Sequence, residues 1–391
     1  MAETFDAVII GAGIMGCSGA YQLARRGMRV VVLEKNGICS GGTGRSSSII
    51  RQHYSNELTA RMALHSLRVF QRFDEAVGGD AGFRETGFVA IAAANNSAGL
   101  AANVALQQSL GIRTTLVGRE ELREILPDTE VDDLVAGAFE SESGYADPHL
   151  TTLAYADAAR RHGAMIVPYN EVTGIRFTGG RVQGVDTRAG PFDAPMVINC
   201  AGPWGARVAA LAGVVVPIDA CRVQVGVFAH DAAQARTHPV VLDFVHGTYI
   251  RPETGNLTLA GLIDPAEANA VVDPDDYPEH SDAEFDAELV ERLLRRFRFM
   301  EGAGLRQGFA SLYGVTPDWH PIMDELPAGS GCYLCAGFSG HGFKLGPAVG
   351  SMLADMVTAE AASGFDWTVF RASRYAAQTP VRGQYEYSIA G

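Results

Sequence analysis

The chain opens with two short apolar runs separated by a segment of helical length. Residues 7–10 and 29–33 consist almost wholly of aliphatic and β-branched side chains, which is typical of strands buried on both faces. Between them, residues 14–26 continue with few polar interruptions, and a run of this length predicts a buried helix. The order strand, helix, strand predicts a parallel βαβ unit at the start of the chain.

Beyond this unit, residues 56–76 repeat apolar side chains at the spacing of an amphipathic helix, and Ser55 or Asn56 is expected to cap its start. Residues 86–144 mix helical and strand patterns and are interpreted as an inserted lobe. The further predicted elements are helices over 98–110, 119–126, 148–162 and 282–298, strands over 87–91, 135–139, 164–167 and 196–200, a hairpin of 172–177 and 181–187, a strand-rich segment over 217–262, and a strand, turn and helix over 331–356. Without an internal repeat, this order predicts two domains between which the chain passes several times.

The composition and charge of the chain argue against several classes of function. The 391 residues carry 31 Lys and Arg against 45 Asp and Glu, a formal net charge of −14, so a broad basic face for nucleic acid is not expected. The six cysteines are scattered, which argues against a disulfide framework and predicts a reducing compartment. The N-terminus shows no signal-peptide pattern, and no apolar window is clean enough for a membrane span. We therefore expect a cytoplasmic protein with no nucleic-acid or membrane partner.

A glycine-rich turn follows the first predicted strand. Gly11, Gly13 and Gly16 form the pattern G-x-G-x-x-G directly before the first helix, and Glu34 ends the next strand. In this context the glycines allow a tight turn, the helix N-terminus can hold a pyrophosphate, and the acid can accept hydrogen bonds from a ribose. An acid at Glu34 disfavours a 2′-phosphate. The pattern therefore predicts a site for FAD or NAD.

Three separated segments carry a resemblance to one family. They are the βαβ unit, the run 41–54 (GGTGRSSSIIRQHY) and the run 336–344 (AGFSGHGFK). Together they resemble the D-amino-acid oxidase and sarcosine oxidase family of flavoproteins, which has glycine oxidase-like members. The similarity extends nearly from end to end of the chain, and it implies FAD rather than NAD as the cofactor.

The resemblance also implies the fold. It is an α/β fold in which a Rossmann-like FAD-binding domain of the glutathione-reductase type is interleaved with an α+β substrate domain built on a mixed or antiparallel sheet. The discontinuous FAD-binding domain is expected to comprise residues 1–85, 145–216 and 305–391. The substrate-binding domain is expected to comprise residues 86–144 and 217–304.

The family pattern further implies which residues contact FAD and how it is held. Ser311 stands where monomeric sarcosine oxidases carry the cysteine that tethers their flavin, and the loop 43–45 lacks the histidine of other relatives. FAD is therefore expected to bind non-covalently. The expected contacts are Gly11, Gly13, Ile14, Met15, Gly16, Glu34, Lys35, Thr43, Arg45, Ser46, Ser47, Val172, Ala201, Gly202, Trp204, Gly340, His341, Gly342, Phe343 and Lys344.

Four residues are expected at the substrate. Arg51 and Lys344 match the two positions that bind the substrate carboxylate in sarcosine oxidases, a bidentate fork and a point charge. Tyr249 and Tyr313 fall near positions that line the substrate cavity in relatives. The alternatives are that Arg51 anchors a phosphate or a surface acid, that Lys344 only lies at a helix start, and that the tyrosines are half-buried strand residues.

Some residues depart from the family pattern or invite another reading. Thr258 aligns, across a gap, with the lysine that promotes reaction with oxygen in relatives, and Leu262 or a neighbour with a substrate-side histidine, so slow oxidation by oxygen and an apolar pocket are expected. His53 and His341 are interpreted as packing or flavin-loop residues. Cys332 and Cys335 point to opposite faces of a strand and no metal is expected, while the acidic stretch 273–279 is interpreted as a solvated loop.

These expectations combine into a function. The chain is expected to oxidise the C–N bond of a secondary amino acid bearing a carboxylate, an N-substituted glycine above all, by hydride transfer to FAD and hydrolysis of the resulting imine, with oxygen as the acceptor. One alternative is a D-amino-acid or proline-type dehydrogenase with another acceptor. A second is the flavoprotein subunit of a heteromeric oxidase, and the oligomeric state is left open.

Overall fold

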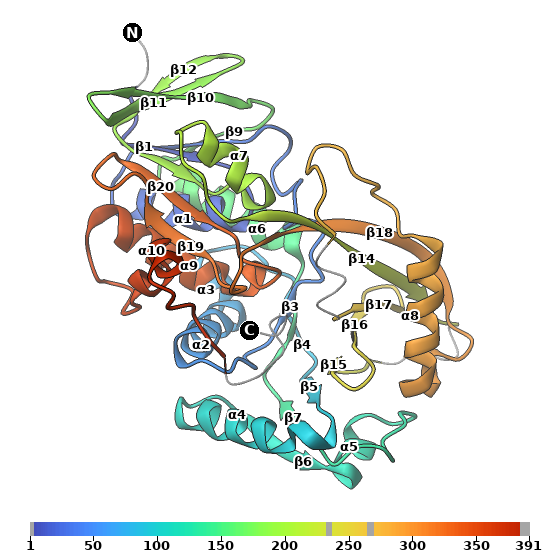
Figure 1. Ribbon diagram of the computed structural model, residues 1–391. Coiled ribbons are helices and arrows are strands. Elements are labelled where there is room, and N and C mark those ends of the chain that lie inside the picture. Colours follow the sequence, from blue (N-terminus) through green and yellow to red (C-terminus); the bar gives the residue numbers. More distant parts are fainter. Residues whose placement is uncertain (1–3, 232–236, 264–269, 384–391) are drawn as a thin grey trace.

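A six-stranded sheet drawn from the start, middle and end of the chain forms the core of one half of the molecule (Figure 1). The computed structural model describes residues 4–231, 237–263 and 270–383. Only the edge pair β19–β20 is antiparallel, so the predicted βαβ unit is confirmed. In spatial order the strands are β19 (Ile322–Glu325), β20 (Cys332–Ala336), β13 (Val197–Asn199), β1 (Ala7–Ile10), β2 (Val30–Leu33) and β9 (Met165–Val167).

The two faces of this sheet are covered differently. Ala7 and Ile9 of β1 pack into a helical layer, whereas Val8 and Ile10 pack against a small sheet on the other side, as the alternation of a strand requires. The helical layer comprises α1 (Ile14–Arg25), α2 (Glu57–Gln71), α3 (Phe73–Ala76), α6 (Pro148–Arg161) and α9 (Gly342–Thr358). The opposite layer comprises β10 (Val172–Thr178), β11 (Arg181–Thr187), β12 (Gly190–Asp193) and the short α7 (Gly205–Ala210).

An eight-stranded sheet forms the other half of the molecule, at the right and bottom of Figure 1. Adjacent strands of this sheet run antiparallel, except for the parallel pair β15–β5. In order the strands are β18 (Gly304–Val315), β14 (Asp219–Ala229), β17 (Leu257–Leu262), β16 (Thr248–Glu253), β15 (Val240–Asp243), β5 (Phe88–Ile91), β7 (Ala136–Glu140) and β6 (Thr114–Gly118).

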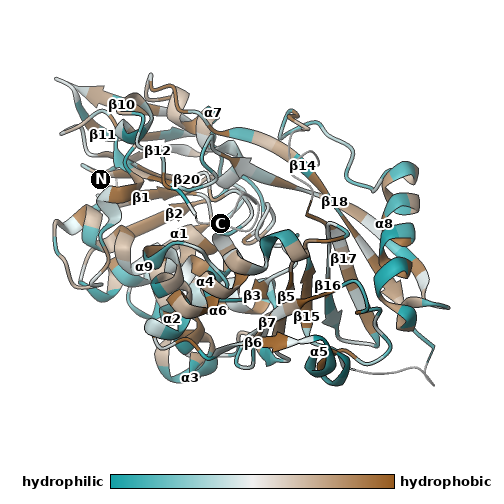
Figure 2. Cartoon of the chain, turned by 60° about the horizontal axis from the view of Figure 1, so that its bottom comes forward, coloured by the Kyte–Doolittle hydropathy of each residue, from teal (hydrophilic) through white to brown (hydrophobic). Residues whose placement is uncertain are grey.

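Helices pack on both faces of the eight-stranded sheet. One face carries α5 (Arg119–Ile125) and α8 (Ala283–Arg296), whose buried Leu289 and Leu293 meet Ile250; the polar side of α8 faces outward in Figure 2. The other face carries α4 (Ser97–Ser109), packed on residues that include Tyr249. The remaining elements are β3 (Ile49–Ile50), β8 (Gly144–Tyr145) and β4 (Arg84–Glu85), which form a small third sheet, and η1 (Ala94–Asn96), η2 (Gly202–Trp204), η5 (Arg298–Met300), η6 (Trp367–Phe370) and α10 (Ser373–Ala376).

The local expectations hold with two differences. The side chain of Asn56 caps α2 by accepting from the amide of Thr59 at 2.8 Å, as predicted. The single helix predicted over 56–76 is divided at Arg72, whose non-helical backbone, with φ −127° and ψ 41°, separates α2 from α3. The twelve-residue strand β18 belongs to the eight-stranded sheet, although most of its residues were assigned to the FAD-binding domain. The mixed α/β class is confirmed, and no helix among the described residues is both long and apolar enough to cross a membrane.

Candidate active site and cofactor cleft

The turn between β1 and α1 requires glycine at two positions. Gly11 has a φ of +105°, and a Cβ there would lie 2.7 Å from the carbonyl oxygen of Cys200. A Cβ on Gly16 would lie 1.9 Å from the carbonyl oxygen of Gly11. The helix therefore packs directly on the turn. Because Gly13 caps α1 without a side chain, the first N–H groups of the helix form a site suited to an anion.

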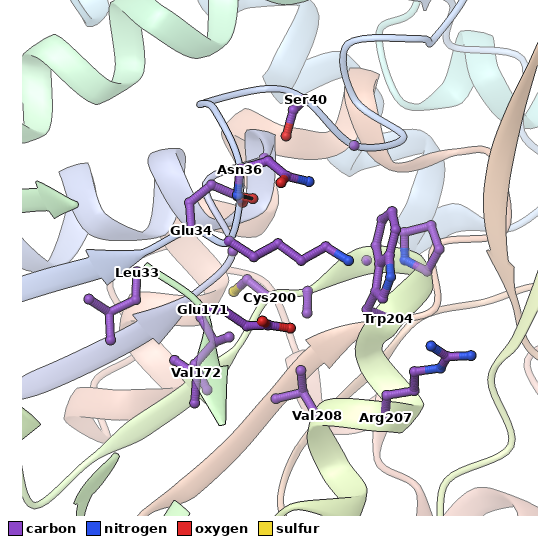
Figure 3. Close-up of a pocket in the computed structure, with 18 of the residues that line it drawn as sticks. Leu33, Glu34, Asn36, Ser40, Glu171, Val172, Cys200, Trp204, Arg207 and Val208 are labelled. Atoms are coloured by element: carbon purple, nitrogen blue, oxygen red, sulfur yellow. Dashed lines mark hydrogen bonds between the residues drawn. The ribbon is translucent and has the colours of Figure 1, made fainter. Parts of the chain in front are cut away.

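A cavity of about 550 Å³ opens beside this turn (Figure 3). In Figure 3 the side chains of Leu33, Glu34 and Val172 lie on one side and those of Trp204 and Arg207 on the other. Eleven of the residues expected to contact FAD line it: Gly11, Gly13, Ile14, Met15, Glu34, Lys35, Thr43, Val172, Ala201, Gly202 and Trp204. The expected contacts that line this cavity thus lie up to 193 positions apart in the sequence, from Gly11 to Trp204.

Glu34 is oriented by two backbone amides. Its Oε2 accepts from the amide of Ala12 at 2.9 Å, and its Oε1 accepts from the amide of Asn36 at 2.9 Å. Each carboxylate oxygen has a second lone pair. The carboxylate is therefore fixed at the cavity wall with acceptor capacity left for a ribose hydroxyl.

Most residues of the acidic stretch 273–279 are exposed, as predicted for a solvated loop, but the stretch also forms one side of the cavity. Asp275 lines the cavity and accepts from Trp204 Nε1 at 2.8 Å and Arg207 Nη1 at 2.7 Å. It also pairs with Lys35, whose ammonium lies 4.1 Å from the centroid of the Trp204 ring. The contacts span at least 68 positions of sequence, and nothing local in the acidic stretch indicates them.

A second, smaller cavity of about 80 Å³ brings together all four residues expected at the substrate, Arg51, Lys344, Tyr249 and Tyr313. Its other lining residues are Ser46, Ser47, Ser48, Ile49, Leu242, Leu262, Ile263, Ser339, Gly340 and Phe343. Leu262 was expected in the pocket, whereas Leu242 and Ile263 were not singled out. No acidic side chain is among the described residues that line this cavity.

The two cations differ in how they are held. The buried guanidinium of Arg51 donates from Nη1 to the carbonyl oxygen of His53 and stacks on Tyr54 with 4.4 Å to the ring centroid. Lys344, in the first turn of α9, is buried and makes no hydrogen bond or ion pair to the described residues. Burial, together with the charge of Arg51, holds the pKa of Lys344 well below its usual range. Arg51 and Lys344 thus bring two cations to one cavity, whose described lining residues include no acidic side chain.

The two tyrosines line the cavity from two strands of the eight-stranded sheet, Tyr249 from β16 and Tyr313 from β18, with β14 and β17 between them. The hydroxyl of Tyr249 bonds to the hydroxyl of Ser47 at 2.6 Å. The ring of Tyr313 packs on Gly340, where a Cβ would come within 2.6 Å of it at a φ of +86°. Burial raises the pKa of both tyrosines, so both hydroxyls stay protonated and able to donate.

The two histidines are neutral and partly enclosed. His53 Nε2 lies 3.1 Å from Asn103 Nδ2, and burial lowers its pKa to about 3. His341 Nδ1 lies 3.4 Å from the Tyr54 hydroxyl, and its buried Nε2 has no hydrogen-bond partner among the described residues. His341 lies at the N-terminus of α9 and directly follows Gly340, which lines the small cavity.

Glu140 of β7 was not singled out in the sequence, yet it lies behind the Arg51 segment. It is fully buried, and its Oε2 accepts from the amide of Gln52 at 2.8 Å and the hydroxyl of Ser143 at 2.6 Å. Burial raises the pKa of this carboxyl to about 7, against the lowering effects of Ser143, Gln52 and Arg51. A buried strand end gives no sequence signal for such a contact, because the partner is 88 positions away.

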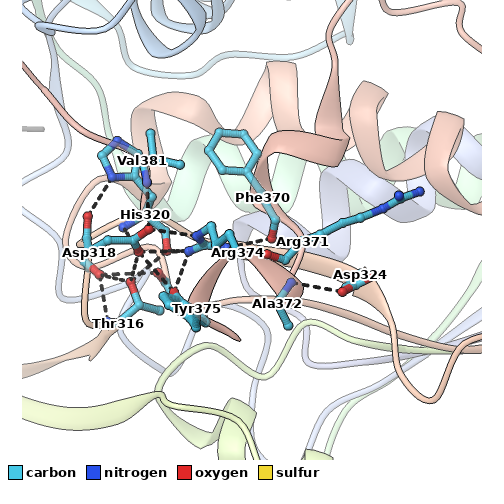
Figure 4. A network of polar contacts seen from close by, with 12 residues as sticks. Thr316, Asp318, His320, Asp324, Phe370, Arg371, Ala372, Arg374, Tyr375 and Val381 are labelled. Carbon is cyan, nitrogen blue, oxygen red and sulfur yellow. Dashed lines mark hydrogen bonds and ion pairs between the residues drawn. The ribbon is translucent and has the colours of Figure 1, made fainter. Parts of the chain in front are cut away.

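A polar network holds the loop that precedes Lys344 (Figure 4). The amide of Thr316 donates to the hydroxyl of Ser339 at 3.2 Å. The turn that follows Thr316 is fixed by a buried ion pair, in which Arg374 Nε lies 2.7 Å from Asp318 Oδ2. Arg374 also donates to the carbonyl oxygen of His320 at 2.9 Å. The segment around α10 thereby secures the loop of the small cavity.

Not every expected residue lines a cavity. Of the remaining expected contacts, Ser46, Ser47, Gly340, Phe343 and Lys344 line the small cavity, and Gly16, Arg45, His341 and Gly342 are absent from the linings of both cavities. Arg45 instead donates to the hydroxyl of Tyr277 at 2.5 Å and to Glu279 Oε1 at 2.7 Å.

Thr258, which was predicted to lie beside the flavin, is absent from the linings of both cavities. Its hydroxyl lies 2.9 Å from His230 Nε2 and 3.0 Å from His238 Nε2. Two positions along the strand, Ala260 packs in the cluster beneath α8, away from the Tyr249 side of the sheet. A gap in the alignment shifts the register, and a shift of one residue moves a side chain to the opposite face.

All six cysteines are free and buried. Cys332 and Cys335 pack into different core clusters on the two sides of β20, as predicted for strand residues three apart. Within the part of the chain that the structure describes, no group of three or more His, Cys, Asp or Glu side chains is arranged to hold a metal ion.

Known proteins resemble this chain over most of its length. Residues 6–356 match the protein family described as DAO, FAD dependent oxidoreductase. Mitochondrial sarcosine dehydrogenase from Homo sapiens is 29% identical over 369 residues, 91% of this chain and 40% of that protein. Monomeric sarcosine oxidase from Bacillus sp. (strain NS-129) is 27% identical over 381 residues, 92% of this chain and 94% of that protein. The chain therefore spans less than half of the dehydrogenase and nearly the whole oxidase.

A solved structure agrees with this similarity. The crystal structure of L-proline dehydrogenase from P. horikoshii matches with a TM-score of 0.89 and 27% identity, covering 97% of this chain and all of that one. The fold of this chain is thus similar to that of a solved protein over nearly its whole length.

Proposed function

This chain belongs to the FAD-dependent oxidoreductase family, and from that premise we propose that it oxidises the C–N bond of a secondary amino acid, an N-substituted glycine being the favoured substrate. The observation that carries the proposal is the pair Arg51 and Lys344, which line one small cavity without an acid among its described lining residues. A substrate carboxylate would bind to these two cations.

The residues of the large cavity suit FAD, the cofactor of this family. The N-terminus of α1 would hold the pyrophosphate, because the turn at Gly11 and Gly13 leaves no room for side chains and the helix lacks a side-chain cap. Glu34 would accept from the ribose. The flavin ring would extend toward the N-terminus of α9, where the buried Nε2 of His341 has no partner among the described residues. Bound FAD supplies the acceptor for the hydride.

The small cavity would orient the substrate. The guanidinium of Arg51 and the ammonium of Lys344 bind the carboxylate, the first with a fixed fork and the second as a point charge. The hydroxyl of Tyr313 makes no hydrogen bond to the described residues and is available to donate to the same carboxylate. These contacts would fix the position of the α carbon of a substrate whose nitrogen is neutral, and bound FAD would supply the acceptor for a hydride from that carbon.

The rest of the cavity would contact the amine substituent. Leu242, Leu262 and Ile263 provide an aliphatic wall, which suits an apolar group on nitrogen. Loss of the hydride and of the N–H proton gives an imine, and water then hydrolyses the C=N bond. The products are an amine and a carbonyl compound.

A proline-type dehydrogenase is the second candidate. Two observations favour it: the likeness to L-proline dehydrogenase at 27% identity, and the small number of lysines in the chain. The chain has two lysines, Lys35 and Lys344; the first lies at the large cavity and the second at the proposed carboxylate site. No third lysine exists to stand over the other face of the flavin, so we propose that oxygen is a slow acceptor.

The experiment that separates these functions is anaerobic reduction of the bound flavin. The purified protein is mixed with sarcosine, a larger N-alkylglycine, L-proline, glycine and D-alanine, and flavin bleaching is followed for each. We expect the N-alkylglycines to reduce the flavin fastest. Faster bleaching by L-proline would favour the second candidate, and bleaching by none of the five would overturn the proposal.

The compartment and the partners are part of the proposal. Six free, buried cysteines suit a reducing compartment, and we propose the cytoplasm. The chain is proposed to act without a second subunit, because Arg51, Lys344 and both tyrosines come from one chain. Size-exclusion chromatography of the active protein tests this: activity that appears only in a heteromeric complex would contradict it.

A further inference from the structure

Residues 270–282, here called the strap, leave the eight-stranded sheet and return to it. Both ends are held by Arg222 of β14: its amide donates to the carbonyl oxygen of Ala270 at 2.9 Å, and its Nε donates to that of Pro278 at 2.9 Å. The same guanidinium pairs with Asp282 at 2.6 Å. Because Arg222 is itself largely buried, the two ends of the strap are firmly anchored.

The middle of the strap reaches the large cavity. Asp275 bridges three residues of the cofactor cleft, namely Lys35, Trp204 and Arg207, through the ion pairs and the indole hydrogen bond described above. Asp273 adds a second contact to Arg207, with Nη2 and Oδ1 2.6 Å apart. The strap therefore links Lys35, which follows Glu34, to Trp204 and Arg207, which follow β13 in the sequence.

A second set of contacts lies farther along the strap. Arg45, in the glycine- and serine-rich loop that crosses from the large cavity to the small one, pairs with Glu279 at 2.7 Å and donates to the Tyr277 hydroxyl at 2.5 Å. Lys35, Arg45 and Arg207 are thus all three neutralised by carboxylates that come from one short segment.

We propose that the strap is a clasp for FAD, and that Asp275 and Glu279 are positioning residues that slow the release of the cofactor. Asp275 lines the cavity directly, so FAD leaves only when the strap moves and its ion pairs break. These pairs are partly exposed, Asp275 by half, and pairs of this kind contribute modestly and are screened by salt. The inference rests on FAD binding alone and is independent of the substrate.

The test measures FAD release rather than turnover. The holoprotein is diluted far below saturation, and the rise of flavin fluorescence gives the release rate. We expect Asp275→Asn and Glu279→Gln each to release FAD about twofold to fivefold faster, and Asp275→Glu to restore the slower rate. The matched control is Asp276→Asn, in the same segment, because the Asp276 side chain makes no hydrogen bond or ion pair to the described residues. Added salt is expected to accelerate release from the parent more than from Asp275→Asn.

Several outcomes would overturn the clasp. They are release from Asp275→Asn and Glu279→Gln at the parental rate, equal acceleration by Asp276→Asn, or an identical salt dependence in parent and variant. Thermal unfolding of each apoprotein is measured alongside, and a drop there as large as in the holoprotein would assign the effect to folding instead. If the parental protein bound no FAD, both the cofactor assignment and the proposed role of the strap in retaining FAD would be overturned.

Discussion

Arg51 and Lys344 line the same small cavity, and the charge of Arg51 adds to burial in lowering the pKa of Lys344. The two cations approach each other without an intervening acid among the described lining residues. We therefore expect this cavity to bind a carboxylate. Its negative charge would offset both the repulsion between the two cations and the cost of desolvating the ammonium.

Removing either cation is expected to weaken carboxylate substrates selectively. Arg51→Ala and Lys344→Ala each delete a charged partner of a desolvated carboxylate, a loss of about 2 to 5 kcal/mol. The flavin spectrum is expected to stay close to that of the parent. Anaerobic flavin reduction is measured with the acid substrate and with its amide, and equal losses for both, or parental rates with the acid, would contradict the assignment.

The affinity of the small cavity for a simple carboxylate is expected to fall as the pH rises. Lys344 has a lowered pKa, so it loses its proton below the usual lysine value, and only the protonated form attracts an anion. Acetate binding, followed through the flavin absorbance, avoids the titration of a substrate amine. The dependence is expected to disappear in Lys344→Met; the same slope in parent and variant would assign it to another group.

Glu140 is expected to make stability fall as the pH rises. Its pKa is raised to about 7 from an ordinary 4.5, so the folded state holds the proton more tightly than the unfolded state. The contribution is present below the unfolded pKa and is lost as the pH rises through the folded one, in total about 3 kcal/mol. Glu140→Gln cannot ionise and is expected to gain stability relative to the parent between about pH 5 and about pH 8.

Urea unfolding of parent and Glu140→Gln at the two pH values checks this. Glu124→Gln, which changes an exposed acid of α5, is the matched control and is expected to follow the parent. Parallel pH profiles for the parent and Glu140→Gln would show that Glu140 does not carry the dependence.

The flavin is expected to leave the denatured chain. Ser311 is a buried residue of β18 and offers no thiol at the position of the family's tether. Acid precipitation is expected to release all of the colour as free FAD into the supernatant. Colour that remains with the washed pellet would mean that another side chain forms the bond.

Reduced flavin is expected to react slowly with oxygen. With both lysines of the chain already placed at the two cavities, the charge that develops on oxygen lacks a dedicated ammonium on the second face. Stopped-flow mixing with oxygenated buffer measures the rate. Thr258→Lys is expected to leave it unchanged, because Thr258 faces the His230 and His238 side of the sheet; acceleration by this variant would reinstate the original alignment.

The sequence predicts features whose causes are local. The turn before α1 and the cap at Asn56 depend on residues within a few positions of each other. The hairpin of β10 and β11 forms through Gly179 and Gly180, which both adopt the positive φ values, +57° and +78°, that glycine tolerates. The resemblance to the family also predicted that Arg51 and Lys344 lie at one site. The two residues are 293 positions apart in the sequence and line the same cavity.

Contacts between residues that are far apart in the sequence could not be predicted from local patterns. Asp275 meets Arg207 only because the strap returns across the cleft, and an acidic loop in solvent has the same composition. Apolar spacing continues through the break between α2 and α3, where Phe70 and Phe73 still stack at 6.0 Å. In both cases tertiary contacts, rather than the local pattern, decide the outcome.

The scarcity of lysine has a practical consequence for attaching this protein to a surface. Amine-directed reagents meet the α-amino group and two side chains, of which Lys344 is buried and Lys35 is partly exposed beside Trp204. Coupling through side-chain amines therefore selects Lys35. It orients the molecule with its cofactor cleft against the support, so that immobilised protein exchanges FAD poorly, whereas coupling through the many surface carboxylates leaves the cleft open.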